Sequence, residues 1–224
     1  MCCRVMGGAN MPIVRAVLFD ADGVLQSPTI RWRAALAKHE EFAIDTVLST
    51  FVAELARIET EHLETERDFS SALARLLVNL GMRINATTVL AILNAIDCDP
   101  EIFNLVRQLK KNDIQCYLAS NQQQHRARHM SNALGYSTLF DKEFYSCQIG
   151  IAKPKVAFFR YIMHEIHETG DELLFIDDRA ENVVAARQAG LHAEIFERSQ
   201  GVGVLEDLLA RHGITSASTS TPGD

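Results

Sequence analysis

The stretch VRAVLFDADGVLQSP, residues 14–28, decides the fold of this chain. Residues 16–19 are an apolar run without polar alternation, which is typical of a strand buried on both faces of a parallel sheet. Asp20 follows directly, with Asp22 and Gly23 behind it. Because ligands bind at the carboxyl ends of strands in open parallel sheets, we predict that Asp20 and Asp22 belong to a functional site.

From Asp99 onward the sequence alternates between helix and strand patterns. Asp99 and Pro100 are a typical N-cap and first residue of a helix that ends near Lys111. Further strands are predicted in DIQCYLAS (113–120), DKEFYS (141–146), DELLFIDD (171–178) and LHAEIFE (191–197), with helices between them and Pro154 at one helix start. This alternation predicts an α/β fold with a doubly wound, Rossmann-like parallel sheet.

Between these two regions the sequence has helical periodicity and no strand pattern. Apolar residues recur at spacings of three and four, first at Ile44, Val47, Leu48, Phe51, Leu55 and Ile58, then at Leu73, Leu76, Leu77 and Leu80 before Gly81. We therefore expect an α/β core formed by residues 12–27 and 98–214, with a helical insert at 28–97. The polar tails, residues 1–11 and 215–224, are expected to be disordered.

The composition restricts the classes of partner. Apolar residues make up 47% of the 224 residues, enough for a sizeable core, and the net charge is −7. The sequence has no strongly basic block and no apolar run that could span a bilayer, and its five cysteines include no CxxC pair. We expect a cytoplasmic protein that binds neither nucleic acid nor membrane, and the sequence does not indicate an oligomeric state.

Polar residues end three of the predicted strands: Asp20, Ser120 and the pair Asp177 and Asp178. Lys153 comes just before a helix, and we expect it at the same solvent-accessible edge of the sheet. Crowded carboxylates require a cation, and hard oxygen ligands select Mg²⁺. A hydroxyl, helix-start amides and a lysine form a cradle for an anion. The set predicts phosphoryl transfer to Asp20 through an aspartyl phosphate.

These residues resemble the four motifs of haloacid dehalogenase-like hydrolases, in the family's order over residues 14–196. The motifs are DADGVL from Asp20, LASNQ around Ser120, GIAKPK around Lys153 and FIDDRAEN from Phe175. The chain is similar to the capped phosphatases of this family that carry an Asp-Asp pair in the fourth motif. The helical insert resembles the family's mobile cap, which closes over small substrates.

The resemblance implies a role for each motif residue. Asp20 resembles the nucleophile and Asp22 the general acid and base, while Ser120 and Asn121 resemble the phosphate binders and Lys153 the residue that neutralises nucleophile and phosphate. It implies Mg²⁺ at Asp20, Asp178 and Asp22, the last through its backbone carbonyl. Asp177 would then support Lys153 or a metal-bound water, and Asn182 would hold the fourth-motif loop.

The predicted function is a magnesium-dependent phosphatase of a small phosphorylated metabolite, such as a sugar phosphate or a nucleotide. A phosphomutase of the β-phosphoglucomutase type shares every core motif and is the main alternative. A dehalogenase needs no proton donor such as Asp22, and a non-catalytic binding protein on the same fold would not need both pairs of acids. Taken singly, each residue also fits a structural role: Asp22 in a turn, Ser120 or Asp178 as a helix cap, Lys153 on the surface.

Overall fold

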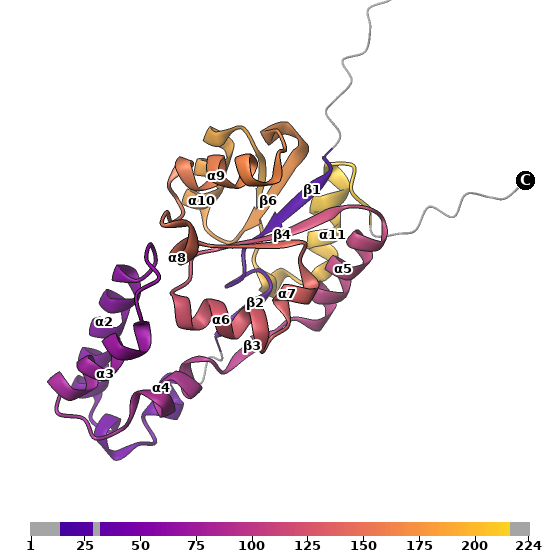
Figure 1. Cartoon of the computed structure of the whole chain (residues 1–224). Helices are drawn as coiled ribbons and strands as arrows, with labels where there is room; N and C mark the ends of the chain where they lie inside the picture. The colour runs from indigo at the N-terminus through magenta and orange to yellow at the C-terminus, as the bar shows by residue number, and fades with distance from the viewer. Residues whose placement is uncertain (1–13, 29–31, 216–224) are drawn as a thin grey trace, which may run out of the picture.

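The computed structural model describes residues 14–28 and 32–215, and Figure 1 shows how their elements are arranged. The five strands of the main sheet are β1 (Ala16–Phe19), β4 (Gln115–Ser120), β5 (Lys142–Tyr145), β6 (Leu173–Asp177) and β7 (His192–Ile195). They pair in parallel in the order β5-β4-β1-β6-β7, so β1 is central and the chain adds strands on both sides of it. The predicted α/β fold with a doubly wound parallel sheet is confirmed.

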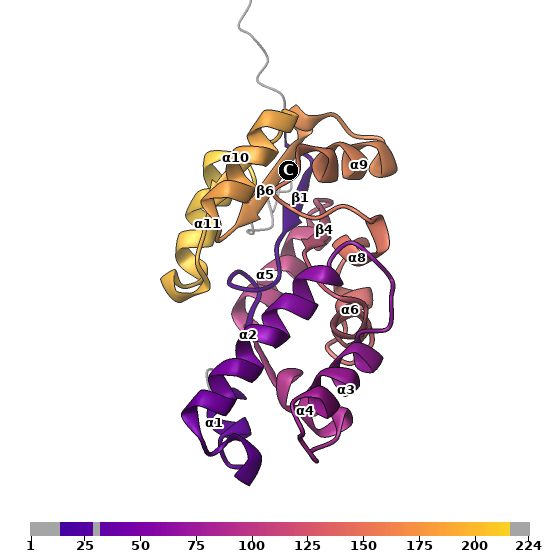
Figure 2. The ribbon, with the colours of Figure 1, turned by 90° about the vertical axis from the view of Figure 1, so that its left-hand side faces the viewer.

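Helices cover both faces of this sheet (Figures 1 and 2). On one face, Val17 and Phe19 share a buried cluster with α5 (Pro100–Lys111), α6 (Gln124–Asn132), α7 (Tyr136–Leu139) and α11 (Val202–Arg211). On the other face, Leu18 and Phe175 pack with α9 (Val156–Ile166) and α10 (Ala180–Ala189). Successive strand residues point to opposite faces, so a strand covered on both sides must be apolar throughout, which explains the run in β1.

The segment between β1 and α5 forms a second, helical unit with its own apolar cluster. Its elements are α1 (Trp32–Leu36), η1 (Glu40–Phe42), α2 (Asp45–Glu61), α3 (Phe69–Asn79) and α4 (Ala86–Leu93). Phe51, Leu73 and Val89 are buried in this cluster, which contains residues of this unit only. Figures 1 and 2 show the helices extending away from the sheet. Ile44, expected in the first apolar stripe, is instead the N-cap of α2 and is 61% exposed.

A short antiparallel ribbon joins the two units and was not predicted. It pairs β2 (Gln26–Pro28) with β3 (Ile96–Cys98) at both expected borders of the helical insert. Each strand has three residues. Gln26 pairs with Cys98 and Pro28 with Ile96, so the paired residues are about seventy positions apart in the chain. No local pattern can reveal such a pairing. The division into core and insert itself stays a prediction.

The remaining elements are short and lie in loops of the core. They are α8 (Ser146–Ile149), η2 (Gly170–Glu172) and η3 (Arg198–Gln200). One predicted boundary was wrong: α9 begins at Val156, with Lys155 as its N-cap, and Pro154 lies before the helix.

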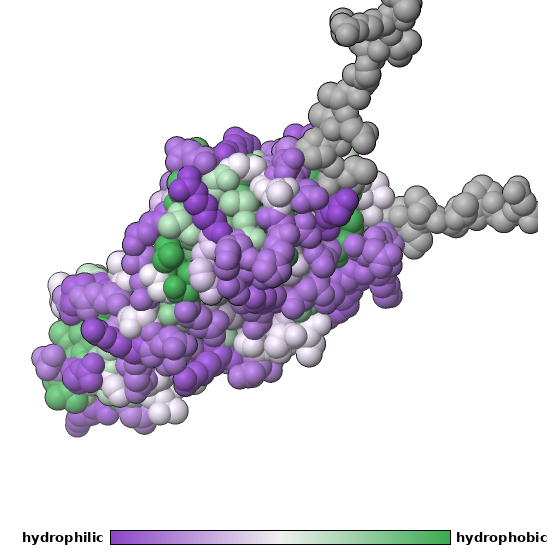
Figure 3. Space-filling view, turned by 45° about the horizontal axis from the view of Figure 1, so that its top comes forward, coloured by the Kyte–Doolittle hydropathy of each residue, from purple (hydrophilic) through white to green (hydrophobic). Residues whose placement is uncertain are grey.

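No helix among the described residues is long and apolar enough to cross a membrane. The face of the molecule in Figure 3 is mostly hydrophilic, with apolar residues in small separate groups. The tails expected to be disordered, 1–11 and 215–224, lie outside the described residues except for Thr215. The carbonyl of Thr215 accepts a hydrogen bond from the Asn112 side chain at 3.1 Å.

Candidate active site

Lys153 joins two carboxylates at the carboxyl edge of the sheet. Its Nζ lies 2.8 Å from Oδ1 of Asp20, which follows β1, and donates to Oδ2 of Asp177, the last residue of β6, at 2.7 Å. Because β1 and β6 are neighbours, both carboxylates reach the same point. The lysine side chain is only 1% exposed. The expectation of a solvent-accessible Lys153 is therefore wrong.

Asn121 explains this burial, because it fixes the loop that carries Lys153. Its side-chain Nδ2 donates to the carbonyl of Lys153, and its Oδ1 accepts from the Lys153 backbone N–H, both at 2.9 Å. These bonds hold the loop beside the end of β4. The Lys153 side chain then reaches Asp20 and Asp177 at the ends of the neighbouring strands. Asn121, expected to bind phosphate, lines the neighbouring cavity but uses its amide for this backbone contact.

Asp177 is fully buried and surrounded by donors. Asn182, in the first turn of α10, donates through Nδ2 to both carboxylate oxygens of Asp177, at 2.9 and 3.0 Å. The backbone N–H of Arg179 adds a bond of 2.8 Å to Oδ1. Together with Lys153, these donors compensate the lost hydration of a buried carboxylate. Asp177 thus bonds to Lys153 on one side and to Asn182 and the Arg179 backbone on the other, while the predicted supporting roles of Asp177 and Asn182 stay predictions.

Asp20, Lys153 and Asp177 are close enough for their charges to shift the pKa values of Asp20 and Lys153. Burial raises the pKa of Asp20 to about 7, while the Lys153 charge lowers it and the Asp177 charge raises it. Burial by itself would lower the pKa of Lys153, but Asp20 and Asp177 outweigh it and hold the pKa above its usual value. Lys153 is therefore charged, and a cation on the open side of Asp20 would keep that carboxylate ionised as well.

Asp178 completes a cluster that fits a hard cation. Asp20, Asp177 and Asp178 each offer a carboxylate oxygen, and these atoms lie within 4.8 Å of one another. Oδ1 of Asp178 is buried and has no hydrogen-bonding partner among the described residues. Burial, with the Asp177 charge in second place, raises the pKa of Asp178. An orphaned oxygen among three carboxylates is suited to a divalent cation that prefers oxygen ligands.

Gly23 is required for this geometry. Its φ is +85°, and a side chain at this position would collide with the Asp178 carboxylate. The first-motif turn can therefore approach Asp178 closely only because residue 23 is a glycine.

Asp22 lies beside the cluster but not in it. Its Oδ1 accepts from Gln26 Nε2 at 2.9 Å, and its Oδ2 accepts from Gln122 Nε2 at 2.7 Å. Gln26 is fully buried and is held in turn by the hydroxyl of Tyr136, which donates to its Oε1 at 2.7 Å. The two amides fix the Asp22 carboxylate away from Asp20. Neither glutamine was singled out from the sequence, although Gln26 directly follows the first motif and Gln122 ends the second.

Two adjoining hollows meet at this carboxylate. One, of about 360 Å³, is lined by Asp20, Ser120, Lys153 and Asp178, and so by two of the three carboxylates of the cluster. The other, of about 430 Å³, lies between the sheet edge and α2. Asp22 and Asn121 line both, so the two hollows form one cleft that turns at Asp22. Ser120 is 1% exposed, and its Oγ accepts from Gln122 Nε2 at 3.4 Å.

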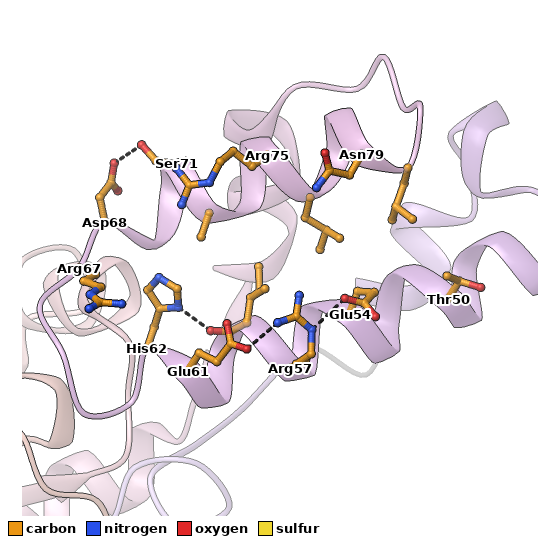
Figure 4. Close-up of a pocket in the computed structure, with 14 residues that line it drawn as sticks. Thr50, Glu54, Arg57, Glu61, His62, Arg67, Asp68, Ser71, Arg75 and Asn79 are labelled. Atoms are coloured by element: carbon orange, nitrogen blue, oxygen red, sulfur yellow. Dashed lines mark hydrogen bonds and ion pairs between the residues drawn. The ribbon is translucent and has the colours of Figure 1, made fainter.

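A larger hollow of about 770 Å³ lies elsewhere, between α2 and α3 (Figure 4). Its charged side chains largely pair with one another: Arg57 bonds to Glu54 and Glu61. His62 uses Nδ1 in a bond to the Ile58 carbonyl. The hollow contains none of the residues at the sheet edge, and no functional role is assigned to it.

Comparisons with known proteins agree with this geometry. A model of the family "haloacid dehalogenase-like hydrolase" matches residues 14–190. The chain is 28% identical over 189 residues to drimenol cyclase drtB of Aspergillus calidoustus, covering 83% of this chain and 33% of that protein. It is 31% identical over 96 residues to sesquiterpene phosphatase astK of Aspergillus oryzae, covering 42% of this chain and 47% of that protein. It thus spans a third and about half of these relatives.

Among solved structures, the chain is similar to a HAD (haloacid dehalogenase-like) family enzyme from Bacteroides thetaiotaomicron. The TM-score is 0.72 at 19% identity, covering 86% of this chain and 98% of that one. That enzyme has also been solved in complex with magnesium and inorganic phosphate. At this identity the likeness demonstrates a shared fold.

Proposed function

The chain belongs to the haloacid dehalogenase-like hydrolase family, and we propose that it is a magnesium-dependent phosphatase of small phosphate monoesters. The observation that carries the proposal is the group at the sheet edge. Lys153 is buried between Asp20 and Asp177, and the unpartnered Oδ1 of Asp178 lies beside them. The Asp20 carboxylate is thus available to attack phosphorus, and the Lys153 ammonium offsets its charge. The unpartnered oxygen of Asp178 remains free to bind a metal ion.

Asp20 and Asp22 divide the chemistry in this proposal. An oxygen of Asp20 attacks phosphorus, and the bond from phosphorus to the alcohol oxygen breaks. Asp22 gives its proton to the leaving alkoxide and so becomes a carboxylate. It then takes a proton from water, which attacks phosphorus and releases inorganic phosphate and free Asp20. Asp22 lines both hollows and so lies between the phosphate and the leaving alcohol.

Lys153 and Ser120 serve the transferring phosphoryl group. The Lys153 ammonium touches Asp20 and would offset the negative charge that the phosphate brings. Ser120 ends the neighbouring strand β4, and its hydroxyl lines the same hollow. Asn121 contributes through the loop contact that keeps Lys153 in place.

Mg²⁺ would be held by Asp20 and Asp178, with the backbone carbonyl of Asp22 as a further ligand. When bound, it supplies positive charge for the phosphate oxygens and keeps the attacking carboxylate ionised. The unpartnered oxygen of Asp178 supports this choice of residues. Asp177 is less suited as a ligand because Lys153, Asn182 and Arg179 already occupy its oxygens.

We further propose that the helical insert, residues 28–97, is a cap over this cleft. Its separate apolar cluster and the position of α2 across the cleft from Asp22 support the proposal. The name of one relative, a sesquiterpene phosphatase, also supports a phosphatase activity for this chain.

The test is hydrolysis of p-nitrophenyl phosphate and trapping of the phosphoenzyme. We expect activity that chelation abolishes and Mg²⁺ restores, and mass spectrometry of acid-quenched enzyme should find the phosphate on Asp20. Asp20→Asn should form no phosphoenzyme because an amide is a poor nucleophile of nearly the same shape. Asp207→Asn, at an exposed position of α11, is the control and should behave as wild type. Full activity in excess chelator, or label on another residue, would contradict the proposal.

A further inference from the structure

The hollow on the far side of Asp22 has an apolar wall. Val52, Leu55 and Ala56 of α2 line it together with Leu63 just beyond the helix. Trp32 and Leu93, from α1 and α4, add apolar surface from the same unit. This hollow joins the Asp20 hollow at Asp22 and Asn121, so it can hold the alcohol part of an ester whose phosphate is at Asp20. Another hollow, of about 440 Å³, also adjoins the Asp20 hollow, but its lining is mostly polar and charged, with Asp99, Glu197 and Arg198.

This wall adjoins the face of α2 that stabilises the helical unit: Leu55 contributes to both, and Val52 also packs against the buried cluster of the unit. Phe51, Leu55 and Ile58 are buried in the cluster of the unit. Val52 and Ala56, one turn apart, lie on the side toward the sheet edge, where Val52 is partly and Ala56 well exposed. Ala56 is exposed and lies outside that cluster, so it extends the apolar surface of α2 into the cleft beyond what packing of the unit requires.

The polar side chains of the core wall are already engaged with the protein. Asn121 bonds to the Lys153 backbone, and Gln122 bonds to Asp22. Oε1 of Gln123 accepts from the N–H groups of His125 and Arg126 and so caps α6. The Thr60 hydroxyl, on the opposite wall, donates to the Ala56 carbonyl. A polyol such as a sugar would lose water here and find few free partners, which is costly.

Glu59 and Arg33 are the polar exceptions in this wall. Arg33 is exposed, and its guanidinium lies over the Trp32 ring, 5.2 Å from the ring centroid. The Glu59 carboxyl group has no hydrogen-bonding partner among the described residues, and the Arg126 charge acts on it. Arg126 in turn donates to the Leu93 carbonyl at 3.1 Å. Burial raises the pKa of Glu59, with the Arg126 charge opposing the shift. The cleft therefore combines an apolar wall with few uncommitted polar groups, chiefly those of Glu59 and Arg33.

We propose that the substrate is the phosphate monoester of a mainly hydrocarbon alcohol, and that Val52 and Ala56 of α2 select it. This inference rests on the proposed phosphatase function and names its substrate class. It differs from the sugar phosphate or nucleotide expected from the sequence, because those leaving groups need several hydrogen bonds, whereas most polar side chains of this cleft already bond to the protein.

The first test compares substrates on the full-length wild-type chain with Mg²⁺. The probes are n-octyl phosphate at monomeric concentrations, glucose 6-phosphate, and p-nitrophenyl phosphate as the reference. We expect kcat/KM for octyl phosphate to exceed that for glucose 6-phosphate by about tenfold or more, as contacts of a few methylene groups allow. If p-nitrophenyl phosphate is hydrolysed but glucose 6-phosphate is the equal or better ester, the substrate inference is overturned alone. No hydrolysis of any ester overturns the phosphatase proposal and this inference together.

The second test assigns the preference to α2. Val52→Asn should lower the octyl-to-glucose ratio of kcat/KM by about tenfold, mainly through KM for octyl phosphate. Val78→Asn is the matched control, because Val78 is 74% exposed on α3 and does not line the cleft. Ala56→Asn provides a second, independent variant, and thermal melting checks that all three fold. An unchanged ratio in both Val52→Asn and Ala56→Asn would overturn the assignment.

Discussion

The two walls of the cleft are built in opposite ways. At the carboxyl edge of the sheet, Asp20, Lys153 and Asp177 are buried and hold one another at distances below 3 Å. On the facing wall, α2 presents Val52 and Ala56 without polar contacts across the cleft. In the proposed function, chemistry that needs fixed charges is placed on the sheet, and recognition of the variable part of a substrate is placed on the helical unit. Substitutions on the two walls should therefore fail differently.

The largest effect is expected from Lys153→Met. The change leaves two buried carboxylates, those of Asp20 and Asp177, in contact without their shared cation. We expect kcat to fall by about 10³-fold or more and stability to fall by about 3–5 kcal/mol, the usual result of breaking a buried ion pair. Urea unfolding and p-nitrophenyl phosphate hydrolysis measure the two losses.

Lys155→Met is the control for this variant, since the side chain of Lys155 is 59% exposed and lies two residues away in the same loop. It should keep nearly full stability and kcat. Normal turnover in Lys153→Met would show that the positive charge at the sheet edge has been assigned to the wrong residue.

Asp22→Asn should come next, with a loss confined to proton transfer. The variant keeps the shape of the side chain, but its single acceptor oxygen can take a bond from only one of the two amides, that of Gln26 or that of Gln122. With p-nitrophenyl phosphate, whose leaving group needs little protonation, we expect a burst of nitrophenol followed by turnover slowed about 10²-fold or more. Rapid-quench labelling should find phosphate accumulated on Asp20. Asp97→Asn, exposed in β3, is the control, and unimpaired steady-state turnover in Asp22→Asn would contradict this role.

The sequence predicted the sheet-edge wall well, for a reason that the fold makes clear. Asp20 and Ser120 directly follow or end parallel strands, and Asp177 ends a third, so the topology alone brings them together. The burial of Lys153 was not predictable in the same way. It depends on two bonds to Asn121, thirty-two positions earlier in the chain, and no strand register links the two residues.

The α2 wall was less predictable, because the residues that face the cleft depend on how the helix is oriented against the core. The spacing of Phe51, Leu55 and Ile58 indicated α2 and its buried face. Val52 and Ala56 are equally visible in the sequence, but only the placement of α2 against the core shows that they face Asp22. The bonds from Gln26 and Gln122 to Asp22 also arise from tertiary contacts, in the second case between residues one hundred positions apart.

An intermediate effect is expected from Asp178→Asn, which tests how far the sheet edge depends on metal. The change removes one anionic oxygen ligand but keeps the size of the side chain that packs against Gly23. We expect the Mg²⁺ concentration for half-maximal activity to rise by about tenfold or more, with most of kcat recovered at saturation. Asp171→Asn is the control, at an exposed site in η2, just before β6 begins. A magnesium titration that does not shift would remove Asp178 from the ligand set.

The smallest effect is expected where the two walls touch. Glu64, in the loop after α2, accepts from the backbone N–H of Ala152 at 2.7 Å and from Lys155 Nζ at 2.7 Å. This contact links the helical unit to the loop that carries Lys153. The ion pair between Glu64 and Lys155 is largely exposed and contributes little to stability. Its loss should therefore change the free energy of substrate binding by about 1 kcal/mol or less. Glu64→Gln should therefore raise KM about two- to fivefold and leave kcat nearly unchanged, because the sheet edge is intact.

Ionic strength sharpens this last test. Exposed charges are screened by salt, so added salt should raise KM of the wild type toward that of Glu64→Gln and affect the variant less. Glu61→Gln is the matched control, because Glu61 pairs with Arg57 inside the helical unit and makes no contact with the sheet edge. If Glu64→Gln lowered kcat by orders of magnitude while Glu61→Gln did not, the helical unit would take part in placing Lys153. The proposed division of roles, with chemistry at the sheet edge and substrate recognition on α2, would then be wrong.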